Sequence, residues 1–104
     1  MRRGRKQQRQ PHPDPAVELR LQRILDLRAS IDRRTDLIRE YRHEISEFHS
    51  QARWEGSTKL AAEYNGRADE LDAKIEILED KIEETGGKIA DLQAKIDPAD
   101  LAFL

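Results

Sequence analysis

The sequence predicts an all-α protein, an antiparallel coiled-coil hairpin of two helices. Three observations support this prediction. The 104 residues are 38% charged and only 5% aromatic, a composition typical of long helices and coiled coils. Apolar residues recur every three or four positions in both halves of the chain. The two repeats are out of phase across Trp54–Thr58, which predicts a reversal of the chain there.

The first 15 residues are basic and contain prolines at alternate positions, Pro11, Pro13 and Pro15. Each proline restricts the residue before it to extended conformations, so we expect a disordered or polyproline-like arm over 1–15. Its basic residues are Arg2, Arg3, Arg5, Lys6 and Arg9. They predict contact with nucleic acid, acidic lipid or an acidic protein partner, or a purely solubilising role.

The first helix is predicted over 16–55, with Asp14 as its N-cap and Pro15 at its first position. Isoleucines recur on one side of its hydrophobic seam, at Ile24, Ile31, Ile38 and Ile45. The other side contains Arg20 and Arg34. We expect their aliphatic stems to lie along the seam while their charged ends reach acidic neighbours, with Leu21 widening the apolar stripe beside Arg20.

The turn is predicted at 56–58 and the second helix at 59–97. The repeat shifts by two positions across the turn, an offset that a continuous coiled coil does not absorb. Gly56 suits the end of one helix and Ser57 the N-cap of the next. When the two halves are folded back, the residue numbers of facing pairs add up to one constant value. These pairs include Ala52 with Tyr64, Phe48 with Ala68, Ile38 with Leu78 and Ile24 with Leu92.

The far end of the second helix has two notable features. Gly86-Gly87, next to Thr85 in the seam, predicts a kink or a frayed point. Pro98 ends the helix and leaves 98–104 as a short apolar tail. The tail contains Leu101, Phe103 and Leu104, which we expect to fold back onto the helices or to dock elsewhere.

A hairpin of two helices buries only one stripe on each, which is little for a stable monomer. The sequence therefore predicts homo- or hetero-oligomers, as a dimeric four-helix bundle, or docking on a larger partner.

Nothing in the sequence indicates catalysis. The many carboxylates have the spacing of charged helix faces, and the chain has no cysteine. His43 and Glu47 have a metal-binding spacing but provide only two ligands. We therefore predict no enzyme, no cofactor and no small-molecule substrate. No stretch is apolar enough for a membrane span or a signal peptide, so we expect a cytoplasmic protein or one exported without a cleavable leader.

Trp54-Glu55-Gly56 between two helices resembles the WXG family of small type VII secretion substrates, the early-secreted-antigen-like proteins. The resemblance implies a leaderless exported protein or chaperone partner that forms a four-helix bundle, with Trp54 and Gly56 contacting the secretion machinery. The chain departs from the family in its export signal, Tyr-X-X-X-Asp/Glu. Tyr41 is followed at the fourth position by Ile45, and Tyr64 by Ala68.

Two other functions fit the same architecture. In the first, the hairpin is a structural adaptor in a virion or other large particle, where the basic arm contacts nucleic acid or an acidic subunit. In the other it is a regulator that probes a larger enzyme, as transcript-cleavage factors probe polymerase. The turn lacks the acidic pair that such a factor needs, so the adaptor is the preferred alternative.

Overall fold

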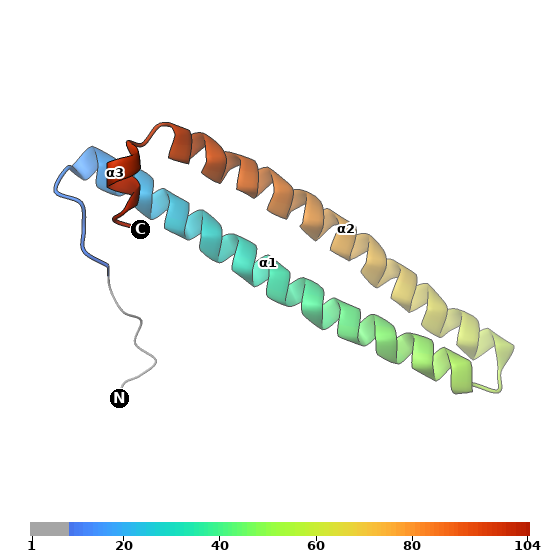
Figure 1. Cartoon of the computed structure of the whole chain (residues 1–104). Coiled ribbons are helices and arrows are strands. Elements are labelled where there is room, and N and C mark those ends of the chain that lie inside the picture. The colour runs from blue at the N-terminus through green and yellow to red at the C-terminus, as the bar shows by residue number, and fades with distance from the viewer. Residues whose placement is uncertain (1–8) are drawn as a thin grey trace, which may run out of the picture.

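The computed structural model describes residues 9–104, and in this part of the chain it contains helices and no strands. Two long helices, α1 (Pro15–Trp54) and α2 (Thr58–Ala94), lie antiparallel and pack against each other. A short third helix, α3 (Pro98–Leu101), lies near the start of α1 (Figure 1). The predicted all-α hairpin is confirmed. Arg2, Arg3, Arg5 and Lys6 lie outside the described residues.

Both long helices begin at side-chain caps that the sequence predicts. The Ala16 N–H donates to Asp14 Oδ1 over 2.9 Å, and Pro15 occupies the first turn, where a missing N–H has no cost. At α2 the Leu60 N–H donates to Ser57 Oγ over 3.4 Å. The helices start and end within one to three residues of the predicted boundaries.

The turn differs from the prediction in one respect. The C-cap of α1 is Glu55, in an extended conformation, and Gly56 does not have a positive φ. A Cβ built on Gly56 would have no atom within 4 Å. The turn therefore does not require a glycine at this position, and Gly56, which follows the C-cap, does not form the left-handed cap that commonly ends a helix.

The helices face each other along the predicted seam. Phe48 stacks on Tyr64 with ring centroids 6.3 Å apart, and the Lys74 amine lies 5.9 Å from the centre of the Tyr41 ring. Tyr64 lies one helical turn from Ala68, the predicted partner of Phe48. Lys74 is the neighbour of Ile75, the predicted partner of Tyr41. Ile38, Ala68, Leu71 and Ile75 are buried between the helices.

Three details of the seam differ from expectation. Arg20 is exposed, and Leu21 is completely buried in its place. Arg34 does bring its charged end into the seam, but it donates to Ser30 Oγ and Thr85 Oγ1 and not to acidic groups. Helix α2 continues through Gly86-Gly87 without a break, so the predicted frayed point is wrong.

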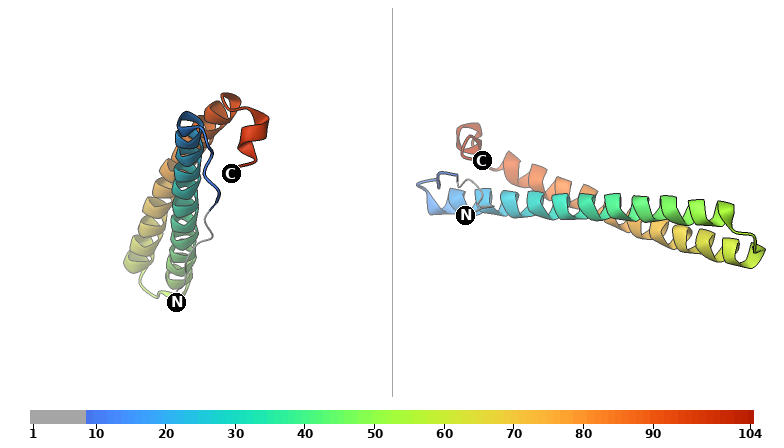
Figure 2. Two further views of the ribbon diagram at one scale, coloured as in Figure 1. Left: turned by 90° about the vertical axis from the view of Figure 1, so that its left-hand side faces the viewer. Right: turned by 90° about the horizontal axis from the view of Figure 1, so that it is seen from below.

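The open end of the hairpin holds a small hydrophobic cluster. Leu21, Ile24 and Ile96 are buried there, and Leu101, Phe103 and Leu104 pack against them. Of the two arrangements expected for the C-terminal tail, the structure shows folding back. Helix α2 ends at Ala94, and Pro98 then keeps Asp97 out of helical conformation, which redirects the chain across the open end (Figure 2).

Residues 9–14 also belong to this end, although the sequence predicts an arm reaching to residue 15. Arg9 donates to both carboxylate oxygens of Glu18, over 3.0 and 2.6 Å. The His12 ring lies 4.5 Å from the Phe103 ring, centroid to centroid. These contacts hold the segment before α1 against the helices and the C-terminal tail.

Candidate interaction surfaces

The turn end presents the residues that resemble the WXG motif. Glu55 and Ser57 hold the turn, because the Ser57 N–H donates to Glu55 Oε1 over 3.2 Å and Ser57 caps α2. Trp54, the last residue of α1, is 82% exposed, and Gly56 is exposed as well. Trp54 and Gly56 are thus exposed at this end, and the side chains that hold the turn are those of Glu55 and Ser57 instead.

Leu60 extends the apolar surface of this end. It lies in the first turn of α2 and is 40% exposed. The turn end of the hairpin therefore carries two exposed apolar side chains, Trp54 and Leu60.

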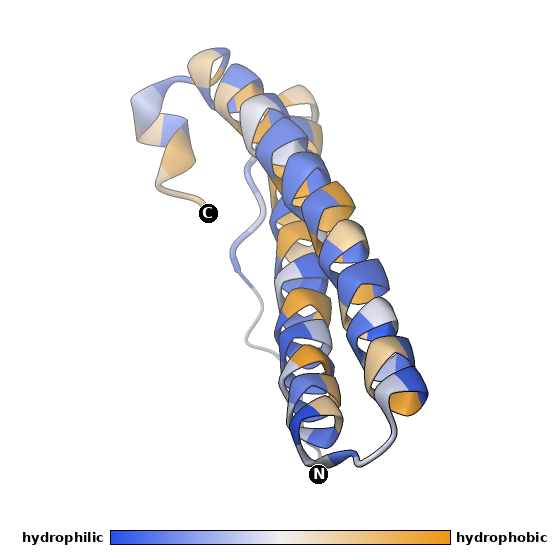
Figure 3. Cartoon of the chain, turned by 90° about the vertical axis from the view of Figure 1, so that its right-hand side faces the viewer, coloured by the Kyte–Doolittle hydropathy of each residue, from blue (hydrophilic) through white to orange (hydrophobic). Residues whose placement is uncertain are grey.

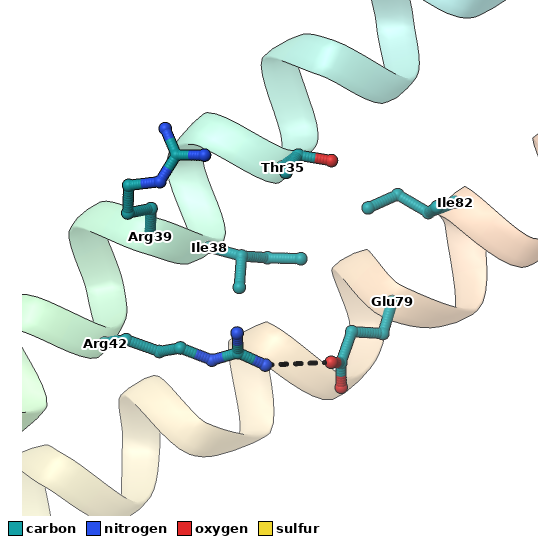
Figure 4. Close-up of a pocket in the computed structure, with 6 residues that line it drawn as sticks. All are labelled: Thr35, Ile38, Arg39, Arg42, Glu79 and Ile82. Carbon is teal, nitrogen blue, oxygen red and sulfur yellow. Dashed lines mark hydrogen bonds and ion pairs between the residues drawn. The ribbon is translucent and has the colours of Figure 1, made fainter.

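One long face of the hairpin, which we call the Arg42 face, is polar. The Arg42 guanidinium donates to Glu79 Oε2 over 3.2 Å, joining α1 and α2 above the seam. Figure 4 shows Ile38 and Ile82 pointing between the helices beside this ion pair. Next to it lies a shallow hollow with four carboxylates along its rim, Asp69, Asp72, Glu76 and Glu79.

The opposite long face is apolar at its centre. A groove there is lined by Leu37, Tyr41, Lys74, Ile77 and Leu78, and we call this side the Ile77 face. Ile77 is 57% exposed. In Figure 3 hydrophobic positions recur along both helices between hydrophilic ones. The two faces thus differ in chemistry although they flank one seam.

The open end carries a set of polar contacts between segments far apart in sequence. The Asp14 N–H donates to His12 Nδ1 over 2.9 Å, which leaves the ring proton on Nε2, and Nε2 donates to Asp100 Oδ1 over 2.8 Å. The His12 N–H donates to Glu18 Oε1. We call His12, Glu18 and Asp100, together with Arg9 and Phe103, the terminal clasp.

The clasp lowers the pKa of one carboxylate. Hydrogen bonds from the Arg9 guanidinium, then from the His12 N–H, shift the pKa of Glu18 below its ordinary value. Both donors stabilise the charged form of Glu18, and this outweighs the small effect of desolvation.

The predicted site residues thus fall into separate places. Trp54 and Gly56 lie at the turn end. Leu101, Phe103 and Leu104 lie at the open end, half-buried against the cluster around Ile24. Arg9, the one basic arm residue within the described part, is already paired with Glu18.

Sequence reasoning missed the terminal clasp and the Arg42–Glu79 ion pair. The ion pair had a detectable signal, since both residues flank the seam on the same side of the predicted hairpin. His12, between two prolines, had none.

The described residues offer no metal site. His43 Nε2 and Glu47 Oε1 are 3.7 Å apart, but both side chains are largely exposed. Across 9–104, no three His, Asp or Glu side chains come together to hold a metal ion. In the same range, no helix is both long and apolar enough to cross a bilayer.

Comparisons with protein families, with curated proteins and with solved structures find no match to this chain.

Proposed function

We propose that this chain is a non-enzymatic interaction protein that binds a protein partner through the turn end of its helical hairpin. The observation that carries the proposal is the exposure of Trp54, 82%, at a position where the hairpin itself has no use for a large aromatic side chain. Buried aromatic anchors contribute much of the energy of protein–protein binding. A rigid rod with a tryptophan at its tip has the shape of a probe that inserts into a pocket.

The WXG-like form of this proposal is that the partner belongs to a secretion machinery and that the protein is exported without a cleavable leader. Gly56 supports it, because neither the φ of this residue nor crowding around it requires glycine in the turn. A contact with another molecule at close range is then the remaining reason for a residue without a side chain beside Trp54.

Co-purification of the tagged full-length chain from its native source tests the proposal. The variant Trp54→Ala should lower recovery of the partner at least about tenfold, the effect expected on removing an aromatic anchor. The matched control is Leu19→Ala, which removes another strongly exposed apolar side chain, 72% exposed, near the opposite end. Equal recovery with all three proteins would contradict a turn-end interface.

The second candidate is the structural adaptor, with nucleic acid or an acidic subunit bound by the basic arm. The supporting observation is the anchoring of Arg9 and His12 at the open end. Arg9 and His12 thus lie at the end of the hairpin opposite Trp54. Deleting residues 1–8 should abolish retention of nucleic acid or of the acidic subunit if the adaptor function is correct, whereas Trp54→Ala should leave it unchanged.

A further inference from the structure

The hairpin is a single layer of two helices. Its Cα atoms extend over 65 × 37 × 15 Å, so both long faces are open over most of their length. Stable domains normally contain at least two packed layers around one core. The buried hydrophobic residues here form only a thin line along the seam and the cluster at the open end.

The Ile77 face has a repeating pattern of charge along α2. Basic residues recur at seven-residue intervals, at Arg67, Lys74, Lys81, Lys88 and Lys95. Acidic residues recur at the same interval four positions earlier, at Glu63, Glu70, Glu84 and Asp91. At the position four residues before Lys81, where this pattern would place an acidic residue, the chain has Ile77. Ile77 also lines the groove.

We propose that a second copy of this chain docks on the Ile77 face, with its hairpin antiparallel to the first. An interface between two identical chains related by a two-fold axis must be complementary to itself. The charge pattern meets this condition when the two-fold axis crosses α2 midway between Ile77 and Lys81. Lys74 then faces Glu84 of the second copy, Lys88 faces Glu70, and Arg67 faces Asp91.

The centre of this arrangement coincides with the apolar groove. The same axis brings Ile77 next to the aliphatic stem of Lys81 of the second copy. An apolar residue in place of an acidic one at 77 therefore gives the centre of the interface an apolar contact. Two hairpin faces of 37 to 40 residues have ample surface for the roughly 800 Å² per partner of a standard interface.

The Arg42 face is a poor alternative for self-association. Its rim carboxylates, Asp69, Asp72, Glu76 and Glu79, would face like charges across a two-fold axis.

The dimer deepens the proposed interaction role but uses a surface other than the turn end. The dimer and the turn-end interface can therefore fail independently.

The first test is the mass of the full chain in solution at micromolar concentration, measured by sedimentation or light scattering. We expect twice the chain mass of 12.1 kDa. The variant Ile77→Lys should weaken the dimer at least about tenfold, since it sets a lysine against Lys81 of the second copy at both symmetric positions, with unchanged helical circular dichroism. The matched control Ala90→Lys adds the same charge at an exposed position of α2 two heptads beyond Glu76, on the side of the Arg42 face, and should remain dimeric. A monomeric wild type, or a dimer insensitive to Ile77→Lys, overturns the proposal.

The charge pattern is tested by a swap. Lys74→Glu should weaken the dimer because two carboxylates would then face each other at both symmetric positions. Adding Glu84→Lys should restore it. The control Lys59→Glu makes the same change of charge away from the interface. If the double variant stays as weak as Lys74→Glu, the proposed pairing is wrong.

The orientation is tested by a distance. The chain has no cysteine, so Ala62→Cys accepts a single spin label on each copy. Antiparallel hairpins separate the two labels by on the order of 50 Å, at a rise of about 1.5 Å per residue from the axis. Labels within roughly 20 Å would mean that the turn ends lie together, which overturns the antiparallel arrangement.

Discussion

His12 and Asp100, 88 residues apart in sequence, are joined by a hydrogen bond of 2.8 Å. The bond links the segment before α1 to helix α3, and the His12–Phe103 contact lies beside it. Together with Arg9–Glu18 it closes the open end of the hairpin. A two-helix hairpin is least constrained where its helices are not connected, so these contacts stabilise the end that would otherwise fray first.

Replacing His12 with alanine should lower the free energy of unfolding by about 1–2 kcal/mol, since it removes one partly buried hydrogen bond and one aromatic contact. Chemical denaturation monitored by circular dichroism measures the loss. The control His43→Ala removes a largely exposed histidine with only a surface pairing and should change stability by less than about 0.5 kcal/mol. Equal effects of the two substitutions would show that the clasp contributes nothing to stability.

The terminal clasp should weaken in acid because of Glu18. The pKa of Glu18 is lower in the folded protein than its ordinary value of 4.5. Its charged form therefore stabilises the fold fully above that value, and the contribution is lost as the pH falls through the lowered pKa. Thermal unfolding between pH 6 and pH 3 should show a stability advantage of wild type over Glu18→Gln that shrinks toward the acidic end. An advantage that is constant over this range would contradict the assignment.

The sequence predicts the hairpin well because its determinants are local or periodic. The caps at Asp14 and Ser57 depend on a few neighbouring residues, and the seam depends on a seven-residue repeat. The terminal clasp could not be predicted in this way. His12 and Asp100 belong to no repeat, and only the folded hairpin and the redirection of the chain at Pro98 bring them together.

The Arg20 position shows a second limit of the periodic argument. A strict repeat places Arg20 in the seam, but burying an unpaired guanidinium is costly, and the neighbouring Leu21 is apolar. The helix therefore presents Leu21 to the cluster of Ile24 and Ile96 and leaves Arg20 in solvent. The energetic cost of one residue shifts the local phase of the seam.

Leu21→Ala should consequently be among the most destabilising substitutions, at about 2–5 kcal/mol, because Leu21 is completely buried. Arg20→Ala should change the free energy of unfolding by less than about 0.5 kcal/mol. Urea denaturation of both variants measures the difference. A strict heptad repeat, with Arg20 in the seam, predicts a much smaller difference between the effects of Leu21→Ala and Arg20→Ala on the free energy of unfolding. The two measurements therefore distinguish the strict repeat from the observed packing.

Gly56→Ala should leave the fold unchanged or slightly more stable. The residue has no positive φ, and a Cβ there meets nothing within 4 Å. Alanine also restricts the unfolded chain more than glycine does, which is worth about 0.4–1 kcal/mol at compatible positions. A clear loss of stability on thermal denaturation would show that the turn needs glycine. A loss of partner binding with intact stability would place Gly56 in the turn-end interface.

Arg34 and Thr85 form a polar contact across the middle of the seam, where Thr85 is buried. Arg34 Nη1 donates to Thr85 Oγ1 over 3.3 Å, and Thr85 Oγ1 donates to the Lys81 carbonyl over 2.8 Å. Thr85→Val should cost about 1–2 kcal/mol, because it removes an acceptor from a partly buried guanidinium. The double variant Arg34→Leu/Thr85→Val replaces both partners with apolar groups and should recover most of this loss. A double-mutant cycle from urea denaturation gives the coupling directly, and strictly additive effects would show that the two side chains do not interact.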